Sequence, residues 1–325
     1  MSLRVAHSLE EWAGQHSPAA RSVVAIGNFD GLHRGHQHIL HRVVRRAREL
    51  QATAAAITFD PHPLKVLRPD AAPPLINTIT QRLAGLEEWG LDAVLVLPFT
   101  VDLSRLAPEA FVKQVLVNTL HVQSALVGQN FRFGHKHAGD VALLREMGAS
   151  LGFEVETVLP VTLRRKLVSS TAVREAVRAG SMTEATRLLG RLFSLTGTIE
   201  AGSGTGRRVV VPTLNLAPQQ ELLPARGVYV TETWLGGDSP ARAEHRFRSV
   251  TNVGVRPTFG GERLTVESHL FDFSGEMETD EAGICFWRRL REEKKFASAA
   301  DLLAQVKRDM ATAQKFFRRL GPARA

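Results

Sequence analysis

The first half of the chain alternates short apolar β-rich runs with longer segments of helical periodicity, and this alternation most limits the folds open to it. The β-rich runs are VVAIG, AAAITF, DAVLVLPF and SALVG, at residues 23–27, 54–59, 92–99 and 124–128. The helical segments between them are HILHRVVRRAREL, QRLAGLEEWG and PEAFVKQVLVNTL. Such alternation predicts a parallel sheet, and nearly continuous apolar strands predict helices on both faces. We therefore expect a doubly wound, Rossmann-like α/β domain whose ligands bind beyond the carboxyl ends of the strands.

The pattern changes after a pair of helices that ends near Gly190. Beyond it the runs are short, rich in Val and Thr, and separated by Gly and Pro: TGTIEAG, RRVVVPTLNL, GVYVTETWL, HRFRSVTNVG and RLTVESHLFDF. They predict a compact antiparallel β-barrel or sandwich, and residues 297–320 have the apolar spacing of a terminal α-helix. Because 325 residues exceed the size of one ordinary core, we expect two domains, at residues 1–187 and 192–325.

Composition narrows the class of protein. A hydrophobic content of 44% and a charged content of 23% are typical of folded domains rather than of disordered chains. The one cysteine, Cys285, can form no internal disulfide, and no apolar run approaches the roughly 20 residues of a membrane span. We therefore expect a cytoplasmic protein without a membrane partner, and the sequence leaves its oligomeric state open.

The formal net charge of +8 favours anionic partners. Nucleotides, RNA and a merely solvated basic face all fit this charge. Few aromatic residues cluster beside the basic ones, so a stacking surface for single-stranded nucleic acid has little support and we expect no nucleic acid partner. An RNA-binding protein without turnover stays open at this point, and salt-sensitive RNA binding would identify it.

The stretch VVAIGNFDGLHRGHQHI, at residues 23–39, joins the first buried strand to a helix. Glycines after the strand let the backbone approach a ligand, and the N–H groups of a helix that begins near Gly35 favour an anion. His33 and His36, three positions apart, can point the same way and donate hydrogen bonds to phosphate oxygens. This pattern predicts a phosphate site, although a histidine at a helix start is ordinarily a cap or a surface residue.

Four histidines within nine positions also suggest zinc. A closed zinc site needs four ligands in tetrahedral geometry, and cysteine ligands are absent here, so we favour phosphate over zinc. The chain has no G-x-x-x-x-G-K-[ST] segment, which argues against a P-loop nucleotidase.

The segment His33-Arg34-Gly35-His36 matches the H-x-G-H signature of nucleotidylyltransferases. The longer string GNFDGLHRGH, followed in order by TFDPHP (58–63), VGQNFRFG (127–134) and SSTAVR (169–174), resembles the prokaryotic bifunctional riboflavin kinase/FAD synthetase family. The resemblance implies an FMN adenylyltransferase domain, in which the histidines contact ATP phosphates while the FMN phosphate attacks the α-phosphorus. A nucleotidyltransferase for another phosphate, such as phosphopantetheine or nicotinamide mononucleotide, stays open because H-x-G-H is shared.

The same resemblance assigns site residues in this domain. Catalytic roles fall to His33, His36 and Arg174. Positions that bind nucleotide are Gly27, Phe29, Asp30, Gly35, Ser170 and Thr171, and positions that bind flavin are Phe59, Asp60, His62 and Asn130. From the residues alone, the Ser-Ser-Thr run fits an ordinary helix N-cap better, and this cap is compatible with phosphate binding.

The second half resembles the riboflavin kinase module of that family. Pro212-Thr213-Leu214-Asn215 matches its P-T-x-N element, and NVGVRPTF (252–259) and TVESHLFDF (265–273) follow. The resemblance implies that Thr213 and Asn215 hold Mg²⁺ and nucleotide phosphates and that Glu267 is the catalytic base. It also implies a nucleotide-binding role for Gly204 and Gly206 and a flavin-binding role for Asn252. Without the resemblance, Glu267 fits a solvent-facing strand residue better.

Two departures from the family pattern concern this second module. Val210-Val211 stands where the family has Gly-Phe, and FSGEMETDEAGICF stands where Leu-Tyr-Gly follows the glutamate strand. We expect a bifunctional enzyme that phosphorylates riboflavin to FMN and adenylates FMN to FAD. ATP is then the co-substrate, Mg²⁺ the cofactor and pyrophosphate a by-product. A degenerate kinase module that only binds flavin is the alternative. A flavin- or RNA-binding regulatory protein that keeps the folds without turnover also stays open, and salt-sensitive RNA binding with no flavin product would favour it.

Overall fold

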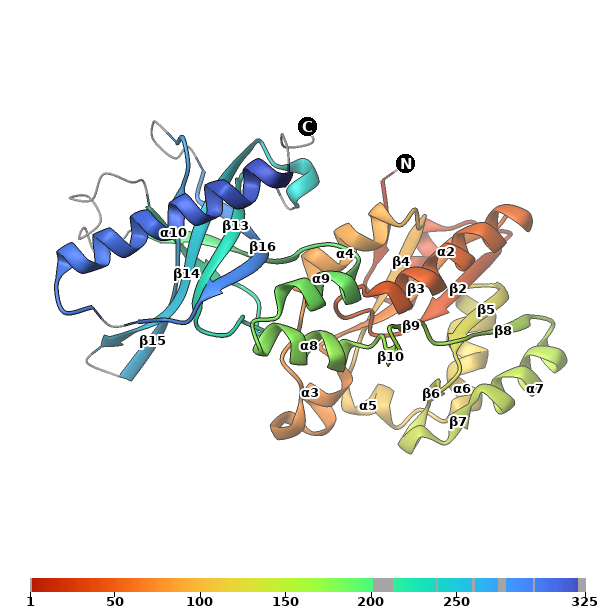
Figure 1. Ribbon diagram of the computed structural model, residues 1–325. Helices are drawn as coiled ribbons and strands as arrows, with labels where there is room; N and C mark the ends of the chain where they lie inside the picture. The colour runs from red at the N-terminus through yellow and green to blue at the C-terminus, as the bar shows by residue number, and fades with distance from the viewer. Residues whose placement is uncertain are drawn as a thin grey trace. The chain divides into compact units, whose positions relative to one another are not determined.

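The computed structural model describes residues 2–200, 213–237, 239–258, 261–273, 279–294 and 296–320. By its internal contacts the chain divides into two compact units, Met1–Ser169 and Ser170–Ala325. The first is a layered α/β unit and the second contains a β-barrel (Figure 1).

A six-stranded sheet forms the centre of the first unit, in the order β1-β4-β3-β2-β5-β8, and every neighbouring pair is parallel. The strands are β1 (Arg4–Ala6), β2 (Ser22–Ile26), β3 (Thr53–Asp60), β4 (Ala93–Pro98), β5 (Val122–Gly128) and β8 (Glu154–Val158). The four central strands β2 to β5 match the four predicted β-rich runs. The edge strands β1 and β8 are only partly buried, so they lack the apolar run by which the others can be found.

Helices cover both faces of this sheet, and each face has its own apolar core (Figure 1). Side chains of α2 and α4 pack against one face. Those of α1, α6, η2 and α7 pack against the other. These elements are α1 (Leu9–Gln15), α2 (Arg34–Glu49), α4 (Ile79–Glu88), α6 (Pro108–Phe111), the π-helix η2 (Val112–Thr119) and α7 (Val141–Leu151). The doubly wound α/β fold is thereby confirmed.

Local sequence explains where these helices begin and which side they bury. In α2 the buried residues Leu40, Val43 and Ala47 follow the spacing of one helical face. Thr78 and Gln81 form a capping box at the start of α4, each side chain satisfying a backbone N–H of the other.

Short elements fill the loops of the first unit. They are α3 (Pro63–Leu67), η1 (Pro69–Ala71), α5 (Val101–Ser104), β6 (Arg132–Phe133), η3 (His135–His137), β7 (Gly139–Asp140), β9 (Thr162–Leu163) and β10 (Lys166–Leu167).

The second unit closes six strands into an antiparallel barrel, in the order β11-β12-β15-β14-β13-β16. Its strands are β11 (Phe193–Glu200), β12 (Thr213–Pro218), β13 (Gly227–Leu235), β14 (His245–Thr258), β15 (Gly261–Leu270) and β16 (Glu281–Arg291). A barrel is therefore confirmed over a sandwich. β16 begins within the departing segment FSGEMETDEAGICF, at Glu281, and is absent from the predicted set, yet it closes the barrel by pairing with both β11 and β13.

Hydroxyl side chains line part of the barrel interior. Thr231, Thr251 and Ser268 lie on three neighbouring strands, are fully buried and are joined by hydrogen bonds of 2.7–3.0 Å. Because side chains alternate along a strand, the neighbours of Ser268, Glu267 and His269, point to the outer face of the barrel.

Three helices complete the second unit: α8 (Ser170–Arg178), α9 (Met182–Leu189) and α10 (Ala299–Leu320). The long terminal helix α10 is confirmed and lies along β13 and β14 (Figure 1), with Ala313 and Phe317 packed on Val228, Val230 and Val250. The helices α8 and α9 group with the barrel by contact. Among the described residues no helix is both long and apolar enough to cross a membrane.

Candidate active sites

Three sequence motifs of the first unit lie side by side at the carboxyl ends of its strands. GNFDGLHRGH follows β2, TFDPHP includes the end of β3, and VGQNFRFG includes the end of β5. These three strands are adjacent, in the order β3-β2-β5, and all run in the same direction. The chain passes from β2 to β3 on one side and later returns to β5 on the other, so β2 marks the topological switch point where α/β sheets bind ligands.

The loop after β2 is held in a conformation that large residues rarely adopt. Phe29 and Leu32 have φ angles of +48° and +42°, and both side chains are 1% exposed. Strain of this kind persists only where the surrounding structure fixes it, and it clusters at ligand sites. Burial of these two apolar side chains supplies that fixation. Phe29, predicted to bind nucleotide, thus lies beneath the loop, while Gly27 continues from β2 and donates its N–H to Ile57 O.

Asp30 is also a buried support of this loop. Its carboxylate is 2% exposed and accepts hydrogen bonds from the backbone N–H groups of Ile76 and Asn77, at 3.0 and 3.1 Å. Gly31, with φ +86°, leaves only enough room for Ile76, because a Cβ at that position would lie 2.8 Å from Ile76 Cδ1. The two segments, 29–32 and 76–77, therefore fix each other.

His33 and His36 lie together at the first turn of α2. His33 is 6% exposed and is the N-cap of the helix, since its Nδ1 accepts the backbone N–H of His36 at 3.3 Å. The neutral ring of His33 then carries its proton on Nε2. The two rings stack with centroids 3.7 Å apart, and Gly35 permits this because a Cβ there would come within 3.1 Å of the His33 ring. His33 is thus a helix cap, the ordinary alternative to a phosphate ligand, and the backbone N–H groups of this turn point toward the same end.

The loop after β3 adjoins the loop after β2. His62 is 7% exposed, caps α3 through its Nδ1, and its Nε2 lies 3.1 Å from the side-chain amide of Asn28. Phe59 is half-buried, with its ring edge-on to Phe99, and Asp60 is exposed. The flavin positions predicted from TFDPHP therefore include one exposed carboxylate and one ring held against the protein.

Asn130 borders a hollow beside the end of β5. The hollow has a volume of about 290 Å³ and is lined by residues of the β5–β6 loop and the start of α7: Gln129, Asn130, Phe131, Arg132, Asp140, Val141 and Ala142. Phe131 and Phe133 stack on each other; Phe133 is 8% exposed and belongs to the core, and the partly buried Phe131 packs against it. The hollow thus presents amide and charged groups at the carboxyl end of the sheet, where the other two motifs also lie.

A buried arginine that belongs to none of the motifs links the end of β3 to the loop after β2. Arg82 of α4 is 1% exposed, and its Nη1 donates to Phe59 O at 3.0 Å and to Thr58 Oγ1 at 3.2 Å. Thr58 Oγ1 in turn donates to Asn28 O at 3.1 Å. The available signal in the sequence is position: Arg82 lies three residues after Ile79 and four before Leu86, on the apolar face of its helix.

Ser170, Thr171 and Arg174 lie in the first turns of α8. Arg174 is 7% exposed, on the same helix as the buried Val173 and Val177. This helix belongs to the second compact unit, whereas His33 and His36 belong to the first.

The predicted kinase residues form a row across three adjacent strands of the barrel. Asn215 of β12 pairs directly with Glu267 of β15, and Glu267 pairs directly with Asn252 of β14. Directly paired residues point to the same face of a sheet. Two amides therefore flank one carboxylate, and all three side chains are half-buried. The structure brings these residues together although 52 positions separate Asn215 from Glu267 in the chain.

Two residues along the strands from this pair, Thr213 pairs with His269 on the same face. Thr213 Oγ1 and His269 Nδ1 are 2.9 Å apart, and burial lowers the pKa of His269, with a smaller opposing effect of Asp309. The neutral ring can then accept a hydrogen bond from the hydroxyl group of Thr213, which leaves the lone pairs of Oγ1 available to another ligand.

Some predicted positions lie outside the described residues. These are Gly204, Gly206 and the pair Val210-Val211, together with residues 274–278 of the altered segment after the glutamate strand.

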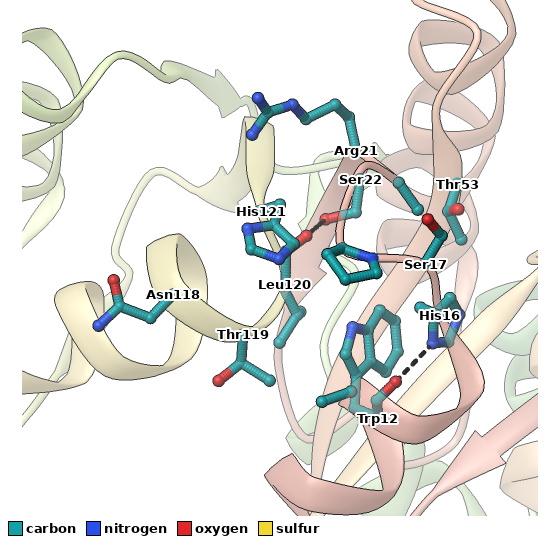
Figure 2. A pocket seen from close by; sticks show the side chains of 13 residues that line it. Trp12, His16, Ser17, Arg21, Ser22, Thr53, Asn118, Thr119, Leu120 and His121 are labelled. Carbon is teal, nitrogen blue, oxygen red and sulfur yellow. Dashed lines mark hydrogen bonds between the residues drawn. The ribbon is translucent and has the colours of Figure 1, made fainter.

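A small cavity at the opposite end of the first unit's sheet is lined by none of the predicted site residues. It has a volume of about 70 Å³ and lies at the amino ends of the strands, near Ser22 and Thr53 (Figure 2). There His16 stacks on Trp12, and its Nδ1 donates to Trp12 O at 2.9 Å. Among the described residues, no group of three or more His, Cys, Asp or Glu side chains is arranged to hold a metal ion.

Comparison with known proteins finds a different family model for each half of the chain. Residues 15–172 match the family model for FAD synthetase, and residues 189–317 match the model for riboflavin kinase. The bifunctional riboflavin kinase/FMN adenylyltransferase of Escherichia coli strain K12 is 33% identical over 99% of both chains. The protein of the same name from Pseudomonas fluorescens is 38% identical, over 91% of this chain and 94% of that one.

Among solved structures, one titled as a macrolide-efflux protein from Streptococcus pneumoniae has a TM-score of 0.83 and 25% identity. The match covers 97% of this chain and 99% of that one. The matched sequences span both modules and include the motifs whose loops meet at the sheet edge and on the barrel face. The chain therefore belongs to the bifunctional riboflavin kinase/FMN adenylyltransferase family.

Proposed function

We propose that this protein makes FAD in two steps, each at its own module. The barrel transfers the γ-phosphoryl group of ATP to riboflavin and produces FMN and ADP. The α/β module then transfers the adenylyl group of a second ATP to FMN and produces FAD and pyrophosphate. The observation that carries the proposal is the convergence of three motif loops at the switch point of the sheet, in a chain whose family relatives align from end to end.

In the adenylyl transfer, a phosphate oxygen of FMN attacks the α-phosphorus of ATP. The new bond is P–O–P, and the bond that breaks joins the α-phosphorus to the oxygen leaving with pyrophosphate. Such a reaction needs positioning and charge stabilisation rather than a covalent nucleophile. His33 and His36 donate to the phosphate oxygens from the first turn of α2, where Gly35 and the helix N–H groups admit an anion.

The family resemblance assigns Ser170, Thr171 and Arg174 to the β- and γ-phosphates in the same reaction. The assignment places the functional domains at 1–187 and 192–325, so that α8 serves the adenylyltransferase. The end of the FAD synthetase match at residue 172, within α8, supports this division. Gly27 contributes backbone to the nucleotide site, and Phe29 and Asp30 hold its loop from beneath.

Flavin binds beside the nucleotide at the same sheet edge. Phe59, Asp60 and His62 form one border, and Asn130 forms another from the hollow at the end of β5. The order of the strands β3-β2-β5 supports this arrangement, because it places the flavin loops on either side of the nucleotide loop.

In the kinase reaction, the 5′-hydroxyl of riboflavin attacks the γ-phosphorus and its proton passes to Glu267. Asn252, directly opposite Glu267, contacts the flavin, and Gly204 and Gly206 approach the nucleotide. Thr213 and Asn215 offer hard oxygen donors on one face of β12, the kind of ligand that Mg²⁺ takes. The cation, when bound, offsets the negative charge of the ATP phosphates.

The partners are accordingly small anions and riboflavin, with no nucleic acid and no membrane. The net charge of +8 supports this, since ATP, FMN, FAD and pyrophosphate are all negatively charged. The single cysteine supports a cytoplasmic location.

Chromatography of flavins tests both activities. Purified protein is incubated with riboflavin, ATP and Mg²⁺, and in parallel with FMN, ATP and Mg²⁺. FAD from riboflavin supports both modules. FAD only from supplied FMN would limit activity to the α/β module and favour the alternative of a degenerate, flavin-binding barrel. FAD from neither would contradict the proposal.

A further inference from the structure

The most deeply buried charge of the first unit lies directly behind the adenylyltransferase loops. Arg82 is 1% exposed, whereas arginine is rarely buried without a paired charge. Its Nη1 holds Phe59 O and Thr58 Oγ1, but its Nε is buried and has no hydrogen-bond partner within the described part of the chain.

Stability alone does not account for this residue. A buried guanidinium with an unsatisfied nitrogen costs free energy, and replacement of a buried charge by an apolar side chain is often neutral or stabilising. Arg82 lies on the apolar face of α4, one helical turn before the fully buried Leu86. Leu or Met would therefore serve the core at least as well as Arg.

The hydrogen bonds of Arg82 instead connect the carboxyl end of β3 with the loop after β2. One bond fixes the carbonyl of Phe59, immediately before the exposed Asp60. The other reaches Thr58 Oγ1, which donates to Asn28 O in the loop between β2 and the stacked histidines. A single guanidinium thus holds the carboxyl end of β3 and, through Thr58, the loop after β2.

Its charge matters as well. Burial lowers the pKa of Arg82, and the carboxylates of Asp30 and Asp60 act in the opposite direction. Asp30 is a buried carboxylate in the loop proposed to admit the phosphates of ATP, and its negative charge opposes their binding.

We propose that Arg82 is a positioning residue of the adenylyltransferase site: it aligns the Asn28 and Phe59 backbones through Nη1 and offsets the charge of Asp30 beneath the nucleotide. The inference rests on the proposed FMN adenylyltransferase activity. It separates into a positional part, which depends on Thr58, and an electrostatic part, which depends on the cation.

Three variants separate these parts: Arg82→Met removes both, Arg82→Lys keeps the charge, and Thr58→Val removes the hydroxyl link alone. The matched control is Arg45→Met, an exposed arginine on α2. For each protein the unfolding temperature, kcat and KM for FAD formation, the Kd of ATP by calorimetry, and riboflavin kinase activity are measured.

We expect Arg82→Met to lower kcat about 10- to 100-fold, the loss typical of small misplacements, and to weaken ATP binding. Arg82→Lys should recover most of the ATP affinity but not kcat. Thr58→Val should lower kcat without changing the Kd of ATP. The control and the kinase activity should stay near wild type in all cases.

Failure is distinguishable at each level. If the wild-type protein forms no FAD from FMN, the proposed function itself fails. If the wild type is active and Arg82→Met keeps its kcat and ATP affinity, the role of Arg82 is wrong. Should Arg82→Met not fold, Thr58→Val decides: a lower kcat with an unchanged unfolding temperature supports the proposal, and an unchanged kcat overturns it.

Discussion

His33 accepts the backbone N–H of His36 through Nδ1 while the two rings stack 3.7 Å apart, so each histidine fixes the other at the start of α2. Capping and phosphate binding are therefore not competing roles here. The cap selects the neutral tautomer of His33 that bears its proton on Nε2. A substitution at His33 therefore changes both the helix cap and the donors proposed for phosphate, whereas one at His36 removes a stacked ring and keeps the capping N–H.

His36→Ala should reduce FAD formation by about 10²- to 10³-fold, the effect of losing a donor to transition-state charge. FMN formation from riboflavin should stay near normal, because the barrel has its own site. Steady-state rates of both reactions on one preparation check this. Equal loss of the two activities would point to misfolding instead.

His33→Asn and His33→Ala separate capping from chemistry. Asparagine is a good N-cap and alanine is not, so Ala should lower the free energy of unfolding by about 1 kcal/mol relative to Asn. Both variants should lose FAD formation to a similar extent, because neither restores the ring. Urea unfolding and flavin chromatography measure the two effects, and full activity in the Asn variant would show that His33 is only a cap.

Glu267→Gln should suppress riboflavin phosphorylation and leave adenylylation of supplied FMN intact. The amide keeps the size and the row with Asn215 and Asn252 but accepts no proton. Glu281→Gln, at an exposed position of β16, is the matched control. A kinase rate unchanged by Glu267→Gln would remove Glu267 as the base.

The pKa of His16 in the folded protein is lowered, mainly by burial, with Trp12 O opposing and Arg4 adding to the shift. The unfolded chain then binds more protons than the folded one as pH falls below the ordinary histidine value of about 6.5. The contribution of His16 to stability should be complete above that pH and decline below it. Unfolding free energies from pH 8 to pH 5 should therefore fall less steeply for His16→Gln than for wild type, and parallel curves would contradict this.

Burial raises the pKa of Cys285 to about 12, with the charge of Glu232 adding to the effect. The thiol, 5% exposed on β16, should therefore be almost wholly protonated at pH 8. A disulfide reagent such as dithionitrobenzoate should react with one equivalent of thiol in denaturant and with almost none in the native protein. Rapid native reaction would mean that β16 opens readily.

Much of the fold follows from local pattern. The four central strands of the sheet are apolar throughout and bounded by helices, and GVYVTETWL, at residues 227–235, coincides with β13. What escapes prediction is either weakly patterned, as in the half-exposed β1 and β8, or set by distant partners, as in β16. Arg82 belongs to the second kind, because nothing in QRLAGLEEWG shows that its side chain ends beneath another strand.

The sites follow the same rule. His33 and His36 are close in sequence, so their spacing predicts their proximity. The row of Asn215, Glu267 and Asn252 depends on the pairing of three strands, which spacing alone does not give. There the family resemblance supplied the residues, and the register of the barrel supplies the geometry.

With Glu267 as the proposed base, that row makes riboflavin phosphorylation a sensitive report on strand alignment. If β15 were displaced by one residue against its neighbours, Val266 or Ser268 would occupy the position of Glu267 and the carboxylate would face the barrel interior. A misaligned barrel could keep nearly all its backbone hydrogen bonds and still have no base beside its amides. Recovery of kinase activity after refolding would therefore count only correctly registered molecules, a distinction that measurements of overall β content cannot make.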